Sequence, residues 1–203
     1  MKKAIASTTV LIEHNREKLL NAVLYFLRNT KHCGTTKLCK LLYYLDFLHF
    51  RQTGRSVTGL RYYAWGYGPV PSDFWREVTK SPGKDLLQIV AISEKAKAED
   101  FTEMKPKGRF DARWFSKREM RIIEYLSRHF RDARADQMVK VAHMRNQPWD
   151  TTVRTKGRNA EIDYMLALDN RPGSISRDEA LERAEDRNAV RKAFGAVRNS
   201  PAP

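Results

Sequence analysis

Two cysteines and two histidines lie close enough in the sequence to suggest a metal site. His32, Cys33, Cys39 and His49 supply sulfur and nitrogen ligands of the kind that zinc prefers. Structural zinc sites use closely spaced cysteine pairs, and this chain has neither that spacing nor a second pair. We therefore interpret the cysteines as reduced thiols buried near a helix start, and we expect no metal and no other cofactor.

Nucleophilic catalysis has little support in the sequence. The chain lacks the Gly-x-Ser-x-Gly elbow of serine hydrolases and a glycine loop that would cradle phosphate. Cys39 and His143 stay open as a thiol–base pair, as they would in any chain that holds both residue types. A hydrolase is the least favoured class, and we expect a binding protein that is not an enzyme and has no catalytic residue.

The segment from His143 to Trp149 combines an imidazole at an expected helix end with an indole directly after Pro148. The helix dipole would favour the cationic form of His143. Trp149 either closes the core with its N–H bonded to a carbonyl or serves in recognition, and we favour the first role. For His143 the structural and the functional roles stay equally open.

Asp46 and His49 interrupt an apolar helix expected over residues 37–51. They lie three residues apart and therefore share a face. An unpartnered carboxylate among apolar side chains would be costly. The pair therefore predicts either a buried hydrogen-bond network or a contact site.

An aromatic strand leads into a rigid turn at residues 66–71. Alternation along a strand places Tyr63, Trp65 and Tyr67 on one face and Tyr62 on the other, so that one face serves the core. Tyrosine and tryptophan are frequent interface anchors. The turn Gly66-Tyr67-Gly68-Pro69-Val70-Pro71 should not continue a helix or a strand, because its glycines permit unusual backbone angles and its prolines fix theirs.

The elements that position these residues are mostly helical. Apolar spacing predicts helices over 12–30, 37–51, 116–130, 135–144 and 161–168, with a short helix from Pro71 to Val78 and strands over 60–65, 86–92 and 109–115. Helix 37–51 is apolar on two sides, so it should be the central buried helix. The fold class is therefore α+β, mainly α with a small antiparallel β-sheet.

Glycine and capping residues along the chain predict where several helices begin and end. Gly34 should end the first helix, and Thr35 or Thr36 should cap the second. Ser116 to Glu119 and Ser176 to Glu179 read as capping boxes. Residues 93–108 should form a charged loop.

The chain of 203 residues carries a formal charge of +14. Residues 105–158 hold 15 Lys or Arg against 6 Asp or Glu. Such a field attracts phosphates and acidic proteins alike, so we expect weak, nonspecific nucleic-acid binding. No stretch is long and apolar enough to cross a membrane, and residues 1–10 lack a signal-peptide core, so we expect a cytoplasmic protein without membrane contact.

The region around residues 171–174 is a plausible domain boundary. We assign residues 1–170 to one domain and residues 171–203 to a charged C-terminal helical extension. The helix expected from Arg177 to Val197 has only a thin apolar stripe of Leu181, Ala184, Val190 and Val197. It would dock on the body, bind a partner or stay partly disordered.

Two motifs in this order resemble the Panacea domain, the family of SocA-like antitoxins and phage-associated, GepA-like proteins. They are the helix from Lys37 to Phe50, which holds the Lys, Leu, Tyr, Asp and His positions, and the turn Gly68-Pro69-Val70-Pro71. The later His143 and Pro148-Trp149 are similar to the second block of that domain. The resemblance covers about residues 19–168 and leaves the tail outside.

The resemblance implies a mainly helical domain with a small sheet that neutralises a cognate protein toxin of a toxin–antitoxin system by direct binding. One similar member acts instead as a proteolytic adaptor that delivers its toxin to the ClpXP protease. The alternative function is a nucleic-acid-binding protein or repressor of prophage origin, resting on the charge. The candidate partner-binding residues are Tyr43, Asp46, His49, Tyr63, Trp65, Tyr67, Gly68, Pro69, Val70, Pro71, His143 and Trp149.

Overall fold

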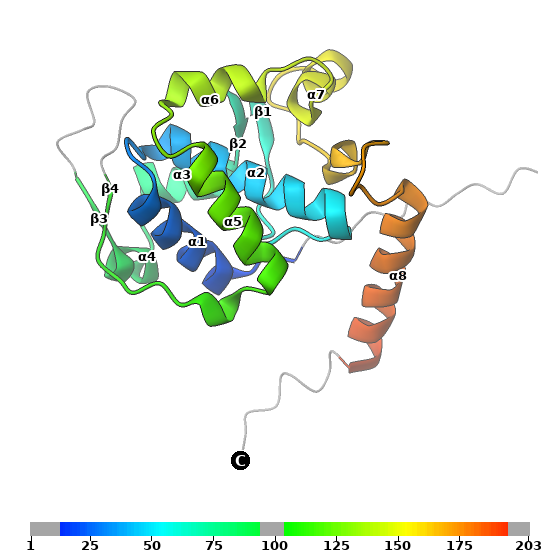
Figure 1. Ribbon diagram of the computed structural model, residues 1–203, viewed down its shortest axis with the longest axis horizontal. Coiled ribbons are helices and arrows are strands. Elements are labelled where there is room, and N and C mark those ends of the chain that lie inside the picture. Colours follow the sequence, from blue (N-terminus) through cyan, green and yellow to red (C-terminus); the bar gives the residue numbers. More distant parts are fainter. Residues whose placement is uncertain (1–12, 94–103, 195–203) are drawn as a thin grey trace, which may run out of the picture.

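Helix α2 (Thr35–Thr53) runs through the centre of the molecule (Figure 1). The computed structural model describes residues 13–93 and 104–194 of the chain. Buried side chains lie along α2 from Thr35 to Phe50. They include both apolar sides of the expected helix, apart from the half-buried Leu48: one side is Leu38, Leu41, Leu42, Leu45 and Leu48, and the other is Tyr43, Phe47 and Phe50. Burial of so much apolar surface makes α2 the main source of hydrophobic stabilisation, and the expected central buried helix is confirmed.

Among the described α-helices, three make the most extensive contacts with α2. They are α1 (Arg16–Asn29), α5 (Lys117–His129) and α6 (Ala135–Ala142). The side chain of Asn15 caps α1 by accepting the N–H of Lys18. The capping box expected at α5 is confirmed, because Ser116 accepts the N–H of Glu119 and Glu119 accepts the N–H of Ser116.

The predicted boundary between the first two helices was wrong by a few residues. Helix α1 ends at Asn29, and Gly34 is the residue before α2 rather than the stop of α1. Thr35 is already the first residue of α2, so neither Thr35 nor Thr36 caps it through a side chain.

Two separate two-stranded antiparallel sheets replace the single sheet that we expected. Strand β1 (Tyr63–Trp65) pairs with β2 (Gly68–Val70), and β3 (Val90–Ile92) pairs with β4 (Met104–Pro106). The turn segment 66–71 was wrongly predicted to avoid regular structure, because β2 occupies its second half. The fold class, α+β and mainly α, is confirmed.

Three other runs were assigned the wrong kind of secondary structure. The run 86–92 is mostly helix α4 (Lys84–Ile89), and only its end is strand. The run 109–115 holds the short 3₁₀ helix η2 (Ala112–Trp114), and the expected helix 161–168 is reduced to the 3₁₀ helix η3 (Tyr164–Ala167). Helix α3 (Ser72–Thr79) follows the turn as expected, whereas α7 (Pro148–Lys156) was not anticipated.

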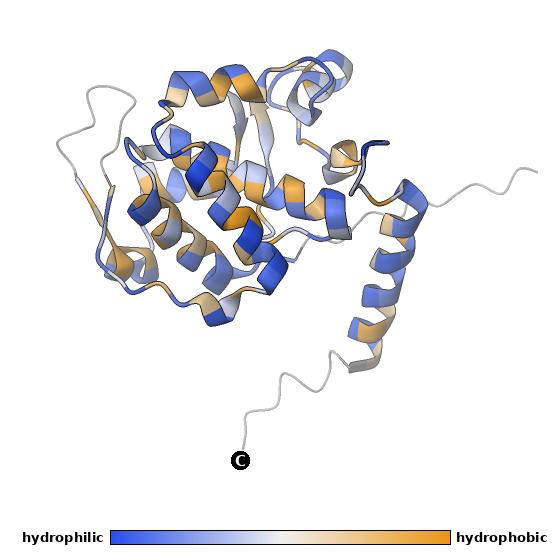
Figure 2. Ribbon diagram, viewed as in Figure 1, coloured by the Kyte–Doolittle hydropathy of each residue, from blue (hydrophilic) through white to orange (hydrophobic). Residues whose placement is uncertain are grey.

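Helix α8 (Arg177–Phe194) docks on the C-terminal end of α2. Ala180 and Ala184 are buried, while most of the visible surface of the helix is hydrophilic (Figure 2). Ser176 accepts the N–H of Glu179 at its start, which is half of the expected capping box. The N–H of Ile175 also donates to the carbonyl of Arg51 at 2.9 Å, so the extension is joined to α2 by the backbone as well.

Some expectations fall outside the described residues. These are the start at residues 1–10, where we expected no signal peptide, most of the loop 93–108 and the apolar position Val197. In the two described ranges, no helix combines the length and apolar character that crossing a bilayer requires.

Candidate functional site

The hairpin of β1 and β2 brings most of the candidate residues together. Tyr63 pairs with Val70 and Trp65 with Gly68, so Gly66 and Tyr67 form a two-residue turn. Gly68 has a φ of +96°, a conformation that L side chains rarely adopt. Tyr67 is 73% exposed at the tip, whereas Gly68, Pro69, Val70 and Pro71 are buried.

Backbone hydrogen bonds fix both edges of β1. Its outer edge meets residues 159–162, where Ala64 donates to Ala160 and Asn159 donates to Ala64, both at 2.9 Å. The N–H of Ile162 donates to the carbonyl of Tyr62 at 2.8 Å. Strand β1 therefore lies between β2 and residues 159–162 and is held in one position.

A buried lysine of α2 is hydrogen-bonded to the backbone of the hairpin. Lys40 of α2 has no exposed surface, and its Nζ donates to the carbonyl of Pro69 at 2.8 Å. Burial lowers the pKa of Lys40 to about 8, because the charged ammonium loses its hydration. The interaction joins α2 to β2 at a point where an unpaired ammonium would be costly.

His143 and Trp149 close the same region from the side. His143 ends α6, and its ring stacks on that of Trp149 with centroids 3.8 Å apart. The indole N–H of Trp149 donates to the carbonyl of Trp65 at 3.0 Å, which confirms the expected structural bond. Burial, together with the charges of Lys40 and Arg158, lowers the pKa of His143, so the expected cationic form was wrong.

The missing side chain of Gly68 leaves room for two polar groups. A Cβ at this position would lie 3.2 Å from Nζ of Lys40 and 3.3 Å from Nε2 of His143. That Nε2 is buried and has no hydrogen-bond partner among the described residues. Any larger residue at position 68 would therefore disturb Lys40, His143 and the backbone at once.

The aromatic side chains of residues 62–65 point to opposite faces, as the alternation predicts. Tyr62 is fully buried, and Tyr63 and Trp65 are half-buried on the other face. Trp65 packs edge-on against Trp75 of α3 with ring centroids 5.3 Å apart. We call Tyr63, Trp65, Tyr67, His143 and Trp149 the hairpin surface.

Asp46 lies in the core rather than on a surface. Its carboxylate accepts the N–H groups of Val57 and Thr58 at 2.7 Å, the hydroxyl of Thr58 at 2.5 Å and that of Tyr62 at 2.9 Å. Burial raises the pKa of Asp46, and these four donors oppose that rise. Of the two expectations for the pair, the buried network is the one that the structure shows for Asp46.

His49 and Tyr43, the other two candidates on α2, lie apart from the hairpin surface. Tyr43 is buried beside Phe47 and Tyr62. His49 donates through Nδ1 to the carbonyl of Arg55 at 2.8 Å, and burial lowers its pKa. Partner binding by these residues stays a prediction, and Tyr43 and Asp46 have almost no exposed surface to offer.

Comparison with known proteins assigns the chain to a family. Residues 38–150, more than half of the chain, match the model described as Antitoxin SocA-like, Panacea domain. The chain belongs to this family. Searches of curated proteins and of solved structures gave no significant match. The Panacea match runs from α2 to the start of α7, so it contains the hairpin, Lys40, Asp46, His143 and Trp149.

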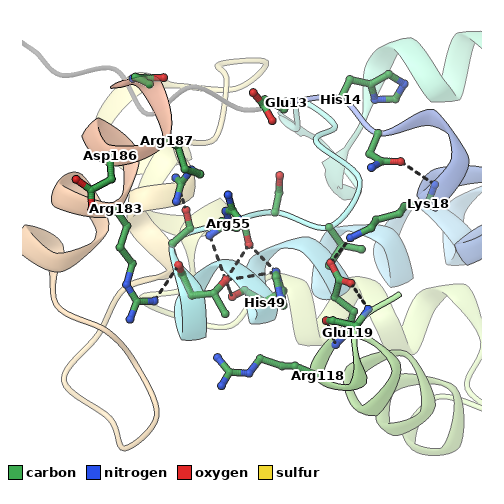
Figure 3. A pocket seen from close by; sticks show the side chains of 17 residues that line it. Glu13, His14, Lys18, His49, Arg55, Arg118, Glu119, Arg183, Asp186 and Arg187 are labelled. Atoms are coloured by element: carbon green, nitrogen blue, oxygen red, sulfur yellow. Dashed lines mark hydrogen bonds and ion pairs between the residues drawn. The ribbon is translucent and has the colours of Figure 1, made fainter. Parts of the chain in front are cut away.

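A separate cleft lies where the Panacea domain meets the segments before and after it. A cavity of about 990 Å³ opens between the C-terminal end of α2, the starts of α1 and α5, and α8 (Figure 3). His49 lines it, with Arg55 and Arg118 from the Panacea match and Arg183 and Arg187 from α8. We call this hollow the basic cleft.

Sequence reasoning missed the buried lysines of α2 and the arginines of the basic cleft. Lys37 is also fully buried, and its Nζ donates to the carbonyls of Lys31, Arg131 and Ala133. A signal for Lys40 was present, because it stands in line with the stripe of Tyr43, Phe47 and Phe50. The cleft gave no local signal, because its residues come from distant parts of the chain.

The thiols show no sign of reactivity. Burial raises the pKa of Cys33 to about 11 and that of Cys39 to about 12, so both are protonated at neutral pH. Both are free, and no His, Cys, Asp and Glu cluster suited to a metal occurs in the described part of the Panacea domain or its flanks. His143 stacks on Trp149, and no hydrogen bond joins it to Cys39 among the described residues.

Proposed function

We propose that this protein is an antitoxin that neutralises a cognate protein toxin by direct contact through the hairpin surface. Its membership of the SocA-like Panacea family carries the proposal, because that family is related to toxin–antitoxin systems. The role is binding rather than catalysis, and the place of action is the cytoplasm, where the toxin would be made.

The hairpin surface suits protein binding because it is already ordered. The backbone of β1 is held on both edges, Lys40 anchors Pro69, and Trp149 is bonded to Trp65. A partner that binds here would spend little free energy on ordering loops. Tyr67 presents a large amphipathic side chain beyond this rigid base, which is the character of an interface anchor.

Co-expression with the product of the neighbouring reading frame tests the proposal. Wild type should restore growth, and Tyr67→Ala should lose rescue while its soluble level stays unchanged. Tyr125→Ala is the matched control, because Tyr125 is 52% exposed on α5, outside the hairpin surface. Full rescue by Tyr67→Ala would reject the surface, and a neighbouring product that is harmless alone would reject the toxin pairing.

The same experiment separates blocking from proteolytic delivery. A blocked toxin accumulates as a complex with the antitoxin, whereas a toxin delivered to ClpXP falls in amount when the antitoxin is present. Toxin levels measured with and without the protease therefore decide whether this protein is an inhibitor or an adaptor.

Nucleic-acid binding is the second candidate function, favoured by the formal charge of +14. We expect only weak, salt-sensitive binding without sequence preference, because the charge attracts phosphates in general. Titration of several unrelated duplexes at physiological salt is the measurement. A preference for one sequence of about 1000-fold over scrambled DNA would place a repressor function first.

A further inference from the structure

The basic cleft contains guanidinium groups that have no ion pair. Arg55 and Arg118 are exposed, and neither forms a salt bridge within the described residues; Arg118 reaches only the carbonyl of Gln52 at 3.5 Å. Arg187 donates to the carbonyl of Gly54 at 3.0 Å and forms no salt bridge among those residues, although the charge of Glu13 acts on it. Figure 3 shows Arg55 and His49 between Arg118 on one side and the α8 arginines on the other.

Most of the carboxylates near the basic cleft are already engaged. Glu119 pairs with Lys18 at 2.6 Å and also accepts the N–H of Ser116 at 2.7 Å. Glu13 lies 3.4 Å from Arg191 at the outer rim, and Arg183 pairs with Glu179. Asp186 is exposed on α8. The uncompensated charge that faces the cleft is therefore positive.

Carboxylate is the anion that fits this charge pattern best. A guanidinium binds a carboxylate through two parallel N–H donors. A continuous phosphodiester strand would have to pass the carboxylates of Glu13 and Asp186, which line the same cleft.

Residues 1–12 and 195–203 contain no Asp or Glu. The acidic residues outside the described ranges are Glu94, Glu99, Asp100 and Glu103. A partner protein is the source of an acidic segment that the proposed function provides.

We propose that the basic cleft binds an acidic peptide segment of the partner protein, with Arg55, Arg118 and Arg187 pairing with its carboxylates. This inference rests on the proposed function for the identity of the partner. Two walls of the cleft, around Glu13 to Lys18 and along α8, lie outside the Panacea match. The cleft therefore joins segments outside the family match to the matched domain, and its charge favours an acidic partner over a basic one.

A labelled acidic peptide tests the cleft directly. The probe is a fluorescein-labelled decapeptide rich in glutamate, titrated with the full chain and followed by fluorescence anisotropy. We expect Arg55→Glu/Arg118→Glu to weaken binding at least 10-fold. The matched control is Lys107→Glu/Arg109→Glu, which changes the net charge equally at two exposed residues outside the cleft and should bind as wild type does.

Stability separates a binding role from a structural one. Arg55 lies close enough to Arg187 that the two cations repel, so Glu at position 55 should attract Arg187 and keep the melting temperature equal or higher. Equal loss of peptide binding in both double variants would overturn the proposal, because it would show only a response to net charge. Stronger competition by a single-stranded oligonucleotide than by free glutamate peptide would overturn it in favour of nucleic acid.

The Tyr67→Ala variant distinguishes this inference from the proposed function. It should bind the peptide like wild type while losing rescue of the toxin. If Tyr67→Ala rescues fully and the cleft variant still loses the peptide, the cleft stands and the hairpin assignment fails. If the cleft variant binds the peptide normally, the cleft fails whatever the result for Tyr67.

Discussion

Polar side chains are buried along the inner face of α2, whereas others surround an open cleft at its C-terminal end. Along its inner face, Lys40 and Asp46 are fully buried, and each is held by protein hydrogen bonds beneath the hairpin or in the core. At its C-terminal end, arginines from the 54–57 segment, α5 and α8 surround an open cleft. The inner groups fix the shape of the Panacea domain, whereas the outer groups keep charge available for a ligand.

This difference predicts unequal effects of substitution. A buried polar group that loses its partner leaves other groups unsatisfied, which costs stability. An exposed arginine that is replaced leaves water in its place, which changes stability little. The following substitutions test that contrast, in order of decreasing effect on stability.

Asp46→Leu should have the largest effect. It removes the acceptor of Val57 N–H, Thr58 N–H and the hydroxyls of Thr58 and Tyr62. We expect a loss of about 4 kcal/mol, because several buried donors are left without a partner. Urea unfolding followed by circular dichroism measures it, and wild-type stability in this variant would show that the network contributes nothing.

Lys40→Met should change how stability depends on pH. The folded pKa of Lys40 is about 8 against an ordinary value of 10.5. The unfolded chain therefore binds more protons between these values, so the stability of wild type rises as pH increases from about 8 to about 10.5.

The size of that pH effect is about 3 kcal/mol, the free energy that corresponds to a shift of this order. The difference between wild type and Lys40→Met in unfolding free energy, measured at several pH values, cancels the titration of other groups. Parallel curves for the two proteins over this window would mean that Lys40 keeps an ordinary pKa.

Gly68→Ala should destabilise the hairpin by about 2 kcal/mol, because alanine is strained at this φ. Its Cβ would also press on Lys40 and His143. Gly157→Ala is a useful control, since Gly157 also has a positive φ but nothing lies within 4 Å of its Cβ. If Gly68→Ala melts at a temperature no lower than Gly157→Ala, a Cβ at position 68 does not crowd Lys40 and His143.

Arg187→Ala should have the smallest effect, about 1 kcal/mol, because it removes one hydrogen bond to Gly54. The loss should appear mainly as undocking of α8. Hydrogen exchange at the amides of α8 measures it, with exchange in α2 as the internal reference. Equal acceleration in both helices would show that α8 and α2 unfold as one unit.

Local sequence signals predicted the parts of the fold that depend on local chemistry. The two apolar stripes of α2 and the capping box at Ser116 were sufficient, because each acts within a few residues. The run 86–92 was misassigned because a short apolar run fits a strand and a buried helix equally well. Helix α7 was missed although Pro148 at its first position is a known start signal.

The candidate site was harder to predict from the sequence, because its residues come from separate elements of the fold. The bond from Trp149 to Trp65 follows from the chemistry of a buried indole, so it was predicted in kind. The meeting of Lys40, Gly68 and His143 requires α2, β2 and α6 to be placed first. The cationic His143 was a wrong prediction because the helix end was considered without the burial and the neighbouring Lys40.

Binding of the purified toxin to the hairpin surface is the central claim of this account. The most direct test is the dissociation constant of the neighbouring gene product with wild type, Tyr67→Ala and Tyr125→Ala, measured by calorimetry on folded proteins. The account predicts a loss of about 2 kcal/mol, or roughly 30-fold in affinity, for Tyr67→Ala and no change for Tyr125→Ala. Equal affinity for all three proteins would contradict it.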